Sequence, residues 1–186
     1  MNKKQFNSDK FEKLNNPLRF KFLPPKAFKE AAGDVEVKTL ADIGAGTGFY
    51  SKEWTKLFPD SRVIALDISD FMIDYMRKKL SGDYPNLEAR LIQTEKLPLD
   101  NDSVDVFISI NLHHELDDHV NVLHDCFRCI RPGGKILISD WKKIPTKLGP
   151  PLDVRFDPVE VEAQLLAAGF RDVRINNTFE HNYLIS

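Results

Sequence analysis

Apolar residues along the chain form two kinds of pattern, short continuous runs and positions three or four residues apart, and the two kinds alternate. Short apolar-rich runs predict buried strands at residues 38–43, 62–67, 87–94, 104–110 and 135–141. Between these runs, apolar residues recur three and four positions apart, as they do on the buried face of an amphipathic helix. The pattern therefore predicts a chain in which strands and helices alternate.

The helices are predicted from their apolar faces and from the residues at their ends. A proline pair at 24–25 opens a short helix, Ser69 can cap another, and Asp157 with Glu160 has the pattern of a capping box. A further helix is expected at 117–130. The predicted inward positions are Tyr50, Trp54, Leu57 and Phe58, then Met72, Ile73, Met76 and Leu80, and then Val120, Leu123, Phe127 and Ile130.

The order of these elements predicts an α/β fold. Two more short strands fit 171–179 and 181–186, so strand and helix alternate over one expected domain, residues 1–186. Such alternation is typical of a mostly parallel sheet with right-handed crossovers and helices on both faces. Ligands of these folds bind beyond the carboxyl ends of the strands, which directs attention to the loops there.

Composition and charge narrow the function classes. The chain has 26 basic and 28 acidic residues and a formal net charge of −2, so it has no overall basic excess for nucleic acid or an anionic membrane. No apolar run approaches the length of a transmembrane helix, and the first residues lack the apolar core of a signal peptide. Two cysteines do not make a disulfide framework. We expect a cytoplasmic protein without membrane insertion.

Three glycines at every second position follow the first predicted strand. The stretch at 41–50 reads ADIGAGTGFY. The dinucleotide fingerprint needs a third glycine where Phe49 stands, and the lysine of a P-loop is missing. Glycine is costly in ordered structure, so this loop predicts close approach of a ligand to the backbone, though not of a pyrophosphate.

An acid closes the second predicted strand. Asp67 is placed to accept hydrogen bonds from the two hydroxyls of a ribose, as acids do in nucleotide sites. The alternative is that Asp67 caps the next helix. Ser69 is better placed for that role, which favours the ribose.

Four motifs in order carry a resemblance to a known family. They are the D-x-G-x-G-x-G pattern at 42–48, Asp67, VDVFISINLHH at 104–114 and RPGGKILISDW at 131–141. Together they resemble class I S-adenosylmethionine-dependent methyltransferases, and within that class the small ubiquinone/menaquinone C-methyltransferase-like (type 11) group. The resemblance implies a Rossmann-like three-layer sandwich whose seven-stranded, mostly parallel sheet has the order 3-2-1-4-5-7-6, with the last strand antiparallel. It also implies S-adenosylmethionine as cofactor and a small-molecule methyl acceptor.

The same resemblance implies which residues bind the cofactor. Asp42 would orient the glycine loop or reach the cofactor's ammonium group, which the backbone carbonyl near Ile110 or Asn111 would also meet. Gln93 stands where the family has an adenine-binding aspartate, and Glu95 is the alternative if the loop shifts register. The full expected set is Asp42, Gly44, Ala45, Gly46, Gly48, Asp67, Ile68, Gln93, Thr94, Glu95, Ile110 and Asn111.

Two histidines follow the fourth predicted strand, beside the expected position of the reactive methyl group. Histidine titrates near neutral pH, so His114 is the candidate general base or acceptor contact, with His113 second. The alternative is that one packs and the other faces solvent. No metal site is predicted, because Cys126 and Cys129 lie within one helix and a structural zinc needs four converging ligands.

Two flanking segments have open roles. Residues 1–23 carry scattered aromatic side chains that could form a lid over the cofactor or pack on the edge of the sheet. Trp141, Lys142 and Lys143 lead into a proline-rich loop that either shapes the acceptor pocket or is a solvated basic loop.

The leading function is methyl transfer to a small molecule, and a quinone, phenol, thiol or metalloid acceptor all stay open. A nucleic-acid methyltransferase is disfavoured, since the Asn/Asp-Pro-Pro-aromatic motif of the base-amine enzymes is replaced here by Asn111-Leu112-His113-His114. A non-catalytic protein that binds S-adenosylmethionine is a third possibility. A nicotinamide oxidoreductase is disfavoured because Phe49 breaks the fingerprint.

Overall fold

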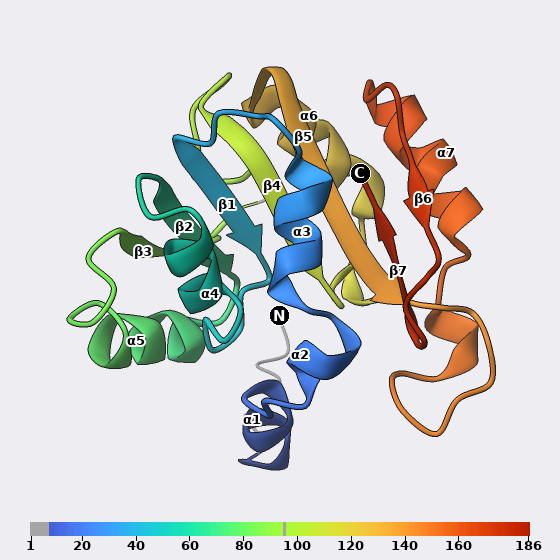
Figure 1. Ribbon diagram of the computed structural model, residues 1–186, viewed down its shortest axis with the longest axis horizontal. Coiled ribbons are helices and arrows are strands. Elements are labelled where there is room, and N and C mark those ends of the chain that lie inside the picture. The colour runs from blue at the N-terminus through green and yellow to red at the C-terminus, as the bar shows by residue number, and fades with distance from the viewer. Residues whose placement is uncertain (1–7, 95) are drawn as a thin grey trace.

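The fold is built on one seven-stranded sheet, described here from a computed structural model for residues 8–94 and 96–186 (Figure 1). Its order is β3-β2-β1-β4-β5-β7-β6, which confirms the order that the resemblance implied. The strands are β1 (Thr39–Ile43), β2 (Arg62–Asp67), β3 (Leu87–Leu91), β4 (Val104–Ile110), β5 (Ile130–Trp141), β6 (Ile175–Asn176) and β7 (Asn182–Ile185).

The strand directions place the loops of interest along one edge. Strands β3, β2, β1, β4 and β5 pair in parallel, whereas β7 pairs antiparallel with both β5 and β6. The carboxyl ends of the parallel strands point downward in Figure 1. The glycine loop, the residues after β4 and the loop after β5 all lie along this carboxyl edge.

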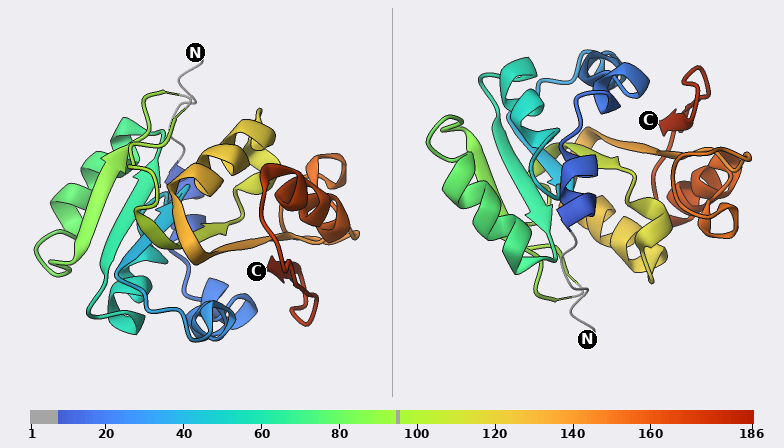
Figure 2. Two further views of the ribbon diagram at one scale, coloured as in Figure 1. Left: turned by 90° about the horizontal axis from the view of Figure 1, so that it is seen from above. Right: turned by 90° about the horizontal axis from the view of Figure 1, so that it is seen from below.

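Helices cover both faces of the sheet and complete three layers (Figure 2). On one face, α3 (Pro25–Ala32), α4 (Ser51–Leu57) and α5 (Asp70–Lys79) bury Phe28, Trp54 and Met76 against the strands. On the other, α6 (His119–Cys129) and α7 (Pro158–Ala168) bury Leu123 and Leu165. Within 8–94 and 96–186, no helix combines the length and apolarity needed to cross a membrane.

The ends of two helices confirm the predicted caps. The Ser69 side chain accepts a hydrogen bond from the backbone N–H of Met72 at 3.4 Å. At the start of α7, Asp157 accepts from Val159 N–H while its own N–H donates to Glu160, which forms the expected capping box. These local signals fix where α5 and α7 begin.

Several strand bounds differ from the prediction. Strand β3 ends at Leu91 rather than Thr94, because its last paired neighbour is Asp67, the end of β2. Strand β5 begins at Ile130, directly after α6, and a register shift opposite Val104–Val106 absorbs the glycines at 133–134. The predicted strands at 171–179 and 181–186 shorten to β6 and β7, because β6 has only one neighbour to pair with.

The predicted inward face of 117–130 is confirmed at Leu123 and Ile130 but wrong at two positions. Val120 is 48% exposed and Phe127 is 44% exposed, whereas Leu123 is buried as expected. Cys126 and Cys129 occupy the buried stripe instead, and burial raises the pKa of the Cys129 thiol to about 11 and that of Cys126 further. The helix is also shorter, because the Asp118 side chain caps it through Asn121 N–H.

Two short helices before α3 were not predicted. Helix α1 (Ser8–Leu14) and the single turn α2 (Arg19–Phe22) lie at the carboxyl edge, below the ends of β1 and β4 in Figure 1. Two 3₁₀ turns were also not predicted, η1 (His113–Glu115) and η2 (Leu152–Val154). All four are too short to show a helical period in the sequence.

Candidate cofactor and acceptor site

Backbone hydrogen bonds fix the glycine loop against β2. The N–H groups of Gly44 and Ala45 both donate to the carbonyl oxygen of Leu66, at 2.8 and 3.0 Å. The N–H of Gly46 donates to Oδ2 of Asp67 at 2.8 Å. The loop therefore turns sharply at the end of β1 and is bound to the acid that closes β2.

Asp67 is a half-buried acceptor at the carboxyl edge. Its Oδ1 accepts from the N–H of Ser69 at 2.9 Å, while Oδ2 accepts from Gly46. Burial raises the pKa of Asp67, and these backbone donors oppose that effect. A carboxylate has about four acceptor sites, so after two backbone bonds it can still accept from ribose hydroxyls.

All three glycines have a positive φ (+70°, +57° and +73°) that disfavours a side chain, but their surroundings differ. A β-carbon on Gly44 would lie 2.8 Å from the Leu112 side chain, and one on Gly48 would lie 2.6 Å from Leu80. At Gly46 the nearest atom is a methyl carbon of Leu14, at 3.7 Å. Close packing within the protein thus adds to the reasons for glycine at Gly44 and Gly48. At Gly46 an added β-carbon would only make an ordinary contact with Leu14, so the positive φ is the main reason for glycine there.

Asp42 lies beneath the loop and is buried. Its Oδ2 accepts from Ser51 Oγ at 2.7 Å and from Trp54 Nε1 at 3.0 Å. Burial raises the pKa of Asp42 to about 6, although these two hydrogen bonds and the positive charge of Arg19 oppose the rise. In the structure, Asp42 therefore ties the end of β1 to the start of α4. A contact with the cofactor's ammonium group stays a prediction.

The expected adenine side of the site is open. Ile68 follows Asp67 and is 78% exposed, and Gln93 and Thr94 are also exposed. Thr94 Oγ1 accepts from the N–H of Lys96. The alternative adenine contact, Glu95, lies outside the described residues.

Asn111 directly follows β4 in an unusual conformation. Its φ is +55°, a left-handed value that few non-glycine residues adopt. Its N–H donates to Ser139, and its Oδ1 accepts from Nδ2 of Asn182 on β7 at 2.8 Å. Sequence reasoning named Ile110 and Asn111 but missed Asn182, since no local pattern links residues so far apart.

His114 forms a dyad with Asp140, the residue before the end of β5. Its Nδ1 lies 2.8 and 3.0 Å from the two carboxylate oxygens, and its backbone N–H donates to Oδ2. The two side chains are 8% and 3% exposed. A neutral imidazole in this setting donates through Nδ1, which leaves Nε2 as the acceptor. The arrangement can therefore take up a proton at Nε2.

His113 points away from the dyad and into the protein. Its Nε2 lies 2.7 Å from Oε1 of Gln164 on α7, and its ring packs on Phe156 and His119. Burial lowers the pKa of His113, which favours the neutral ring. The structure thus separates the two histidines: His113 packs, and His114 stays at the edge with an oriented ring.

The loop after β5 is organised around the buried guanidinium of Arg155. This group donates to backbone carbonyls of Lys142, Ile144, Leu148 and Pro150 and to the hydroxyl of Thr146. Its centre lies 5.7 Å from the Trp141 ring. The loop is therefore well ordered, and it presents exposed apolar side chains on its outside. These are Ile144, Leu148, Leu152 and Val154.

The segment before α3 covers the glycine loop. Leu14 reaches Gly46, Asn15 Oδ1 accepts from the hydroxyl of Thr47 at 3.0 Å, and the Phe20 ring stacks on Phe49 at 4.4 Å. Further along, Phe22 contacts His181, which stacks on Trp141. The segment at 11–23 therefore spans from the glycine loop to the loop after β5.

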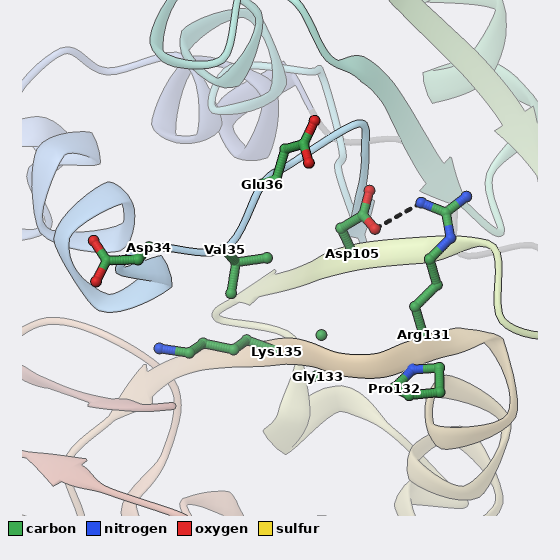
Figure 3. A pocket seen from close by; sticks show the side chains of 9 residues that line it. Asp34, Val35, Glu36, Asp105, Arg131, Pro132, Gly133 and Lys135 are labelled. Atoms are coloured by element: carbon green, nitrogen blue, oxygen red, sulfur yellow. Dashed lines mark hydrogen bonds and ion pairs between the residues drawn. The ribbon is translucent and has the colours of Figure 1, made fainter.

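A separate open hollow lies at the opposite edge of the sheet (Figure 3). Asp105 and Arg131 form an ion pair on its wall, and Asp105 also accepts from the N–H groups of Lys38 and Thr39. Despite its burial, these partners lower the pKa of Asp105. These three hydrogen bonds use the carboxylate to hold the start of β4 against the start of β1 and against Arg131. We therefore assign the hollow a structural role, away from the glycine loop.

Comparison with protein families and relatives agrees with this geometry. A family model described as "Methyltransferase domain" matches residues 41–138, from the middle of β1 into β5. An arsenite methyltransferase of Halobacterium salinarum is 32% identical over 177 residues, covering 87% of this chain and 44% of the relative. A ubiquinone/menaquinone biosynthesis C-methyltransferase of Proteus mirabilis is 30% identical over 118 residues, covering 61% of this chain and 47% of the relative. The chain thus spans less than half the length of either relative.

A solved structure matches the fold along nearly the whole chain. It is a SAM-dependent methyltransferase from Aquifex aeolicus, 28% identical, with a TM-score of 0.88 and 97% of each chain covered.

Proposed function

Because the chain belongs to the family of methyltransferase domains, we propose that it transfers a methyl group from S-adenosylmethionine to a small-molecule acceptor. One observation carries this proposal above the others. The glycine loop is joined through the N–H of Gly46 to Asp67, an acid with acceptor sites to spare, and Leu14 of the segment before α3 covers it. A cradle without phosphate-binding features next to a ribose-binding acid fits an adenosyl sulfonium.

The residues of the carboxyl edge divide into two roles. Gly46, Asp67 and the exposed Ile68 would hold the cofactor, which when bound supplies an activated methyl group. His114 would orient the acceptor and take its proton at Nε2, while Asp140 holds the ring in the tautomer that can do so. Alignment and proton removal are the contributions that such a transfer needs from the protein.

For the methyl acceptor we propose a chemical class and not a single compound. The two relatives are named for arsenite and for ubiquinone/menaquinone biosynthesis, so the family alone does not fix the acceptor. A metalloid acceptor would favour thiolate ligands, but Cys126 and Cys129 are buried with raised thiol pKa values. The base formed by His114 instead suits an acceptor that carries a proton on its nucleophilic atom, such as a phenol.

The segment at 11–23 is proposed to act as the lid over the cofactor. Its contacts with Gly46 and Thr47 support this role, since a ligand that reaches Gly46 would meet Leu14. Residues 1–7 of the predicted lid lie outside the described residues.

Two measurements test the proposal. Titration calorimetry is expected to show one molecule of S-adenosylmethionine or S-adenosylhomocysteine bound per chain. Methyl-labelled cofactor incubated with fractionated cell extract should then transfer label to a small molecule. Gly46→Val serves as the control, because a β-branched side chain is strained at positive φ and would extend from the loop toward Leu14. A wild-type chain that binds neither molecule would remove the proposal.

A further inference from the structure

Glu115 places a second hydrogen-bond acceptor beside the proposed base. It follows His114 in the single turn η1, and its Oε1 lies 4.0 Å from Nε2 of His114. That distance is too long for a hydrogen bond between the two atoms. The carboxylate is 41% exposed and borders solvent, whereas the imidazole is almost fully buried. Nε2 and Oε1 are therefore close neighbours at the carboxyl edge without being bonded to each other.

Nε2 of His114 is available to a ligand. The other ring nitrogen, Nδ1, is bonded to Asp140, and Nε2 makes no hydrogen bond within the described part of the chain. In that part, the buried side-chain atoms without a partner are Ser139 Oγ and Tyr183 Oη. Nε2 is not among them, so solvent reaches it and a ligand can replace that solvent.

Glu115 also lies near the acid that closes β2. Burial is the main cause of the raised pKa of Asp67, and the negative charge of Glu115 adds to the rise. In S-adenosylmethionine a single CH₂ group joins the sulfur that carries the methyl group to the ribose. If Asp67 holds the ribose, a nucleophile bound by Nε2 and Oε1 would therefore lie close to the methyl group.

Two acceptors at this spacing favour a nucleophile that carries two protons. An atom about 2.9 Å from both Nε2 and Oε1 would see them about 90° apart, which the two N–H bonds of a tetrahedral amine reach with about 10° of bending each. A phenol has one such proton and would turn oxygen lone pairs toward one of the acceptors. The anion that it becomes would also lie against the Glu115 carboxylate, where like charges repel.

The charges around this position favour a nucleophile that becomes positive. Among the residues that the structure describes, neither Asp67 nor Asp140 has a lysine or arginine within ion-pair distance. An amine nitrogen gains positive charge as it bonds to the methyl carbon, and fixed carboxylates stabilise charge of that sign in the transition state.

We propose that Glu115 and His114 together bind an amine acceptor, so that the chain acts as an N-methyltransferase. This inference rests on the proposed function and narrows its acceptor from one that carries a proton to one that carries two. The N–H groups of a neutral amine donate to Nε2 and Oε1, and its lone pair forms the bond to the methyl carbon. The carbon–sulfur bond breaks, and its electron pair stays on sulfur. One proton of the new ammonium then passes to Nε2, which leaves a methylated amine and an imidazolium.

The chemical identity of the product tests the class of acceptor. A cofactor with an isotope-labelled methyl carbon is incubated with the wild-type chain and a protein-free extract of small molecules, and the NMR shift of that carbon reports the atom that it is bonded to. We expect the methyl group on nitrogen. A methyl group on oxygen, sulfur or carbon would overturn the proposal. A chain that binds no cofactor, or that labels nothing, would instead contradict the proposed function.

Substitution of Glu115 tests its part in binding the amine. With the identified amine, Glu115→Gln should lower kcat/KM by about 10-fold or more, the usual range for a hydrogen bond to a charged group. Calorimetry should show weaker binding of the amine to the complex with S-adenosylhomocysteine, while affinity for S-adenosylhomocysteine itself changes by less than about twofold. Asp117→Asn, at an exposed aspartate two residues further on, is the matched control.

The remaining outcomes are distinct. Unchanged binding of the amine by a folded Glu115→Gln protein would exclude Glu115 from the acceptor site. An equal loss of affinity for S-adenosylhomocysteine would assign the carboxylate to the cofactor, and either result overturns the proposal. Glu115→Asp retains the charge on a shorter side chain and should fall between the wild type and Glu115→Gln, which keeps the test valid if the glutamine variant does not fold.

Discussion

The two halves of the carboxyl edge are held together by different kinds of contact. On the half formed by β1 and β2, the glycine loop is bonded to Leu66 and Asp67 of the neighbouring strand. On the half formed by β4, β5 and β7, His114 depends on Asp140 and Asn111 depends on Asn182. The first half relies mainly on backbone N–H groups of the glycine loop, whereas the second relies on pairs of side chains from strands far apart in the sequence.

This difference suggests where the protein is general and where it is specific. A half built from backbone groups tolerates change in most side chains but not at Gly46 or Asp67. A half built from long-range side-chain pairs can be changed one pair at a time, which suits the choice of acceptor. Substitutions on the two halves should therefore have separable effects on cofactor affinity and on turnover.

The largest expected effect is on the acceptor half. His114→Ala should lower turnover by roughly 10²–10⁴-fold, the usual contribution of a general base, and should leave cofactor affinity nearly intact. Asp140→Asn should lower turnover as well, because the carboxamide no longer fixes the Nδ1–H tautomer. Steady-state kinetics with the identified acceptor measures turnover, and calorimetry with S-adenosylhomocysteine measures cofactor affinity.

The control for this pair is His124→Ala, an exposed histidine on α6 that should retain the wild-type rate. A rise in the Michaelis constant with unchanged turnover would assign His114 to acceptor contact only. A folded His114→Ala protein with wild-type kinetics would exclude both roles.

The next effect belongs to the cofactor half. Asp67→Ala should weaken S-adenosylhomocysteine binding by about 10- to 150-fold, since hydrogen bonds to a charged group contribute about 1.5–3 kcal/mol. Turnover at saturating cofactor should change much less. Asp70→Ala is the matched control, because Asp70 is an exposed aspartate three residues further on. Unchanged affinity by calorimetry would exclude Asp67 from the ribose site.

A third prediction concerns the loop around Arg155. Arg155→Met removes the donors that five loop residues share, so the loop should open more often. If the free energy needed to open the loop falls by about 1.5–3 kcal/mol, trypsin should cleave at Lys143 and Lys147 about 10- to 150-fold faster. The reason is that cleavage follows the population of the open loop. Arg174→Met, at an exposed arginine, should cleave at the wild-type rate. Equal cleavage of the two variants would mean that other contacts hold the loop.

The smallest effect is a pH dependence from Asp42, whose pKa is raised to about 6. A raised carboxyl pKa means that the folded state binds more protons than the unfolded state between about pH 4 and 6, so stability falls as pH rises through this window. From pH 5 to 7.5 the loss should be about 1 kcal/mol. When the free energy of unfolding is measured with urea at several pH values, Asp42→Asn should lack this loss of stability. The same pH dependence in both proteins would contradict the raised pKa of Asp42.

The fold was largely predictable because its signals are local. Ser69, the Asp157–Glu160 capping box and the apolar runs of β1, β2 and β4 each lie within a few residues, and the structure places them as expected. The elements that were missed or given wrong bounds lack such local signals. Strand β3 ends where its partner β2 ends, and β6 is short because β7 is the strand it pairs with. Helices α1 and α2 are too short to show a helical period in the sequence.

The candidate site was predictable on one half and not on the other. The glycine loop and Asp67 follow or end two neighbouring parallel strands, β1 and β2. A sequence that predicts these two strands therefore also predicts that the loop and the acid lie together. The pairings of His114 with Asp140 and of Asn111 with Asn182 depend on how β4, β5 and β7 align. No spacing in the sequence encodes that alignment, so Asn182 and Arg155 were missed.

The position of β7 has a consequence for how the protein is made. Strands β1 to β3 are complete at Leu91, while Asn182 is synthesised about 90 residues later. Translation proceeds at about 5–20 residues per second, so roughly 5–20 s separate the two events. During that interval the nascent chain can form the glycine loop but cannot hold Asn111 in its left-handed conformation. The glycine loop can therefore form well before Asn182 is available to bond to Asn111.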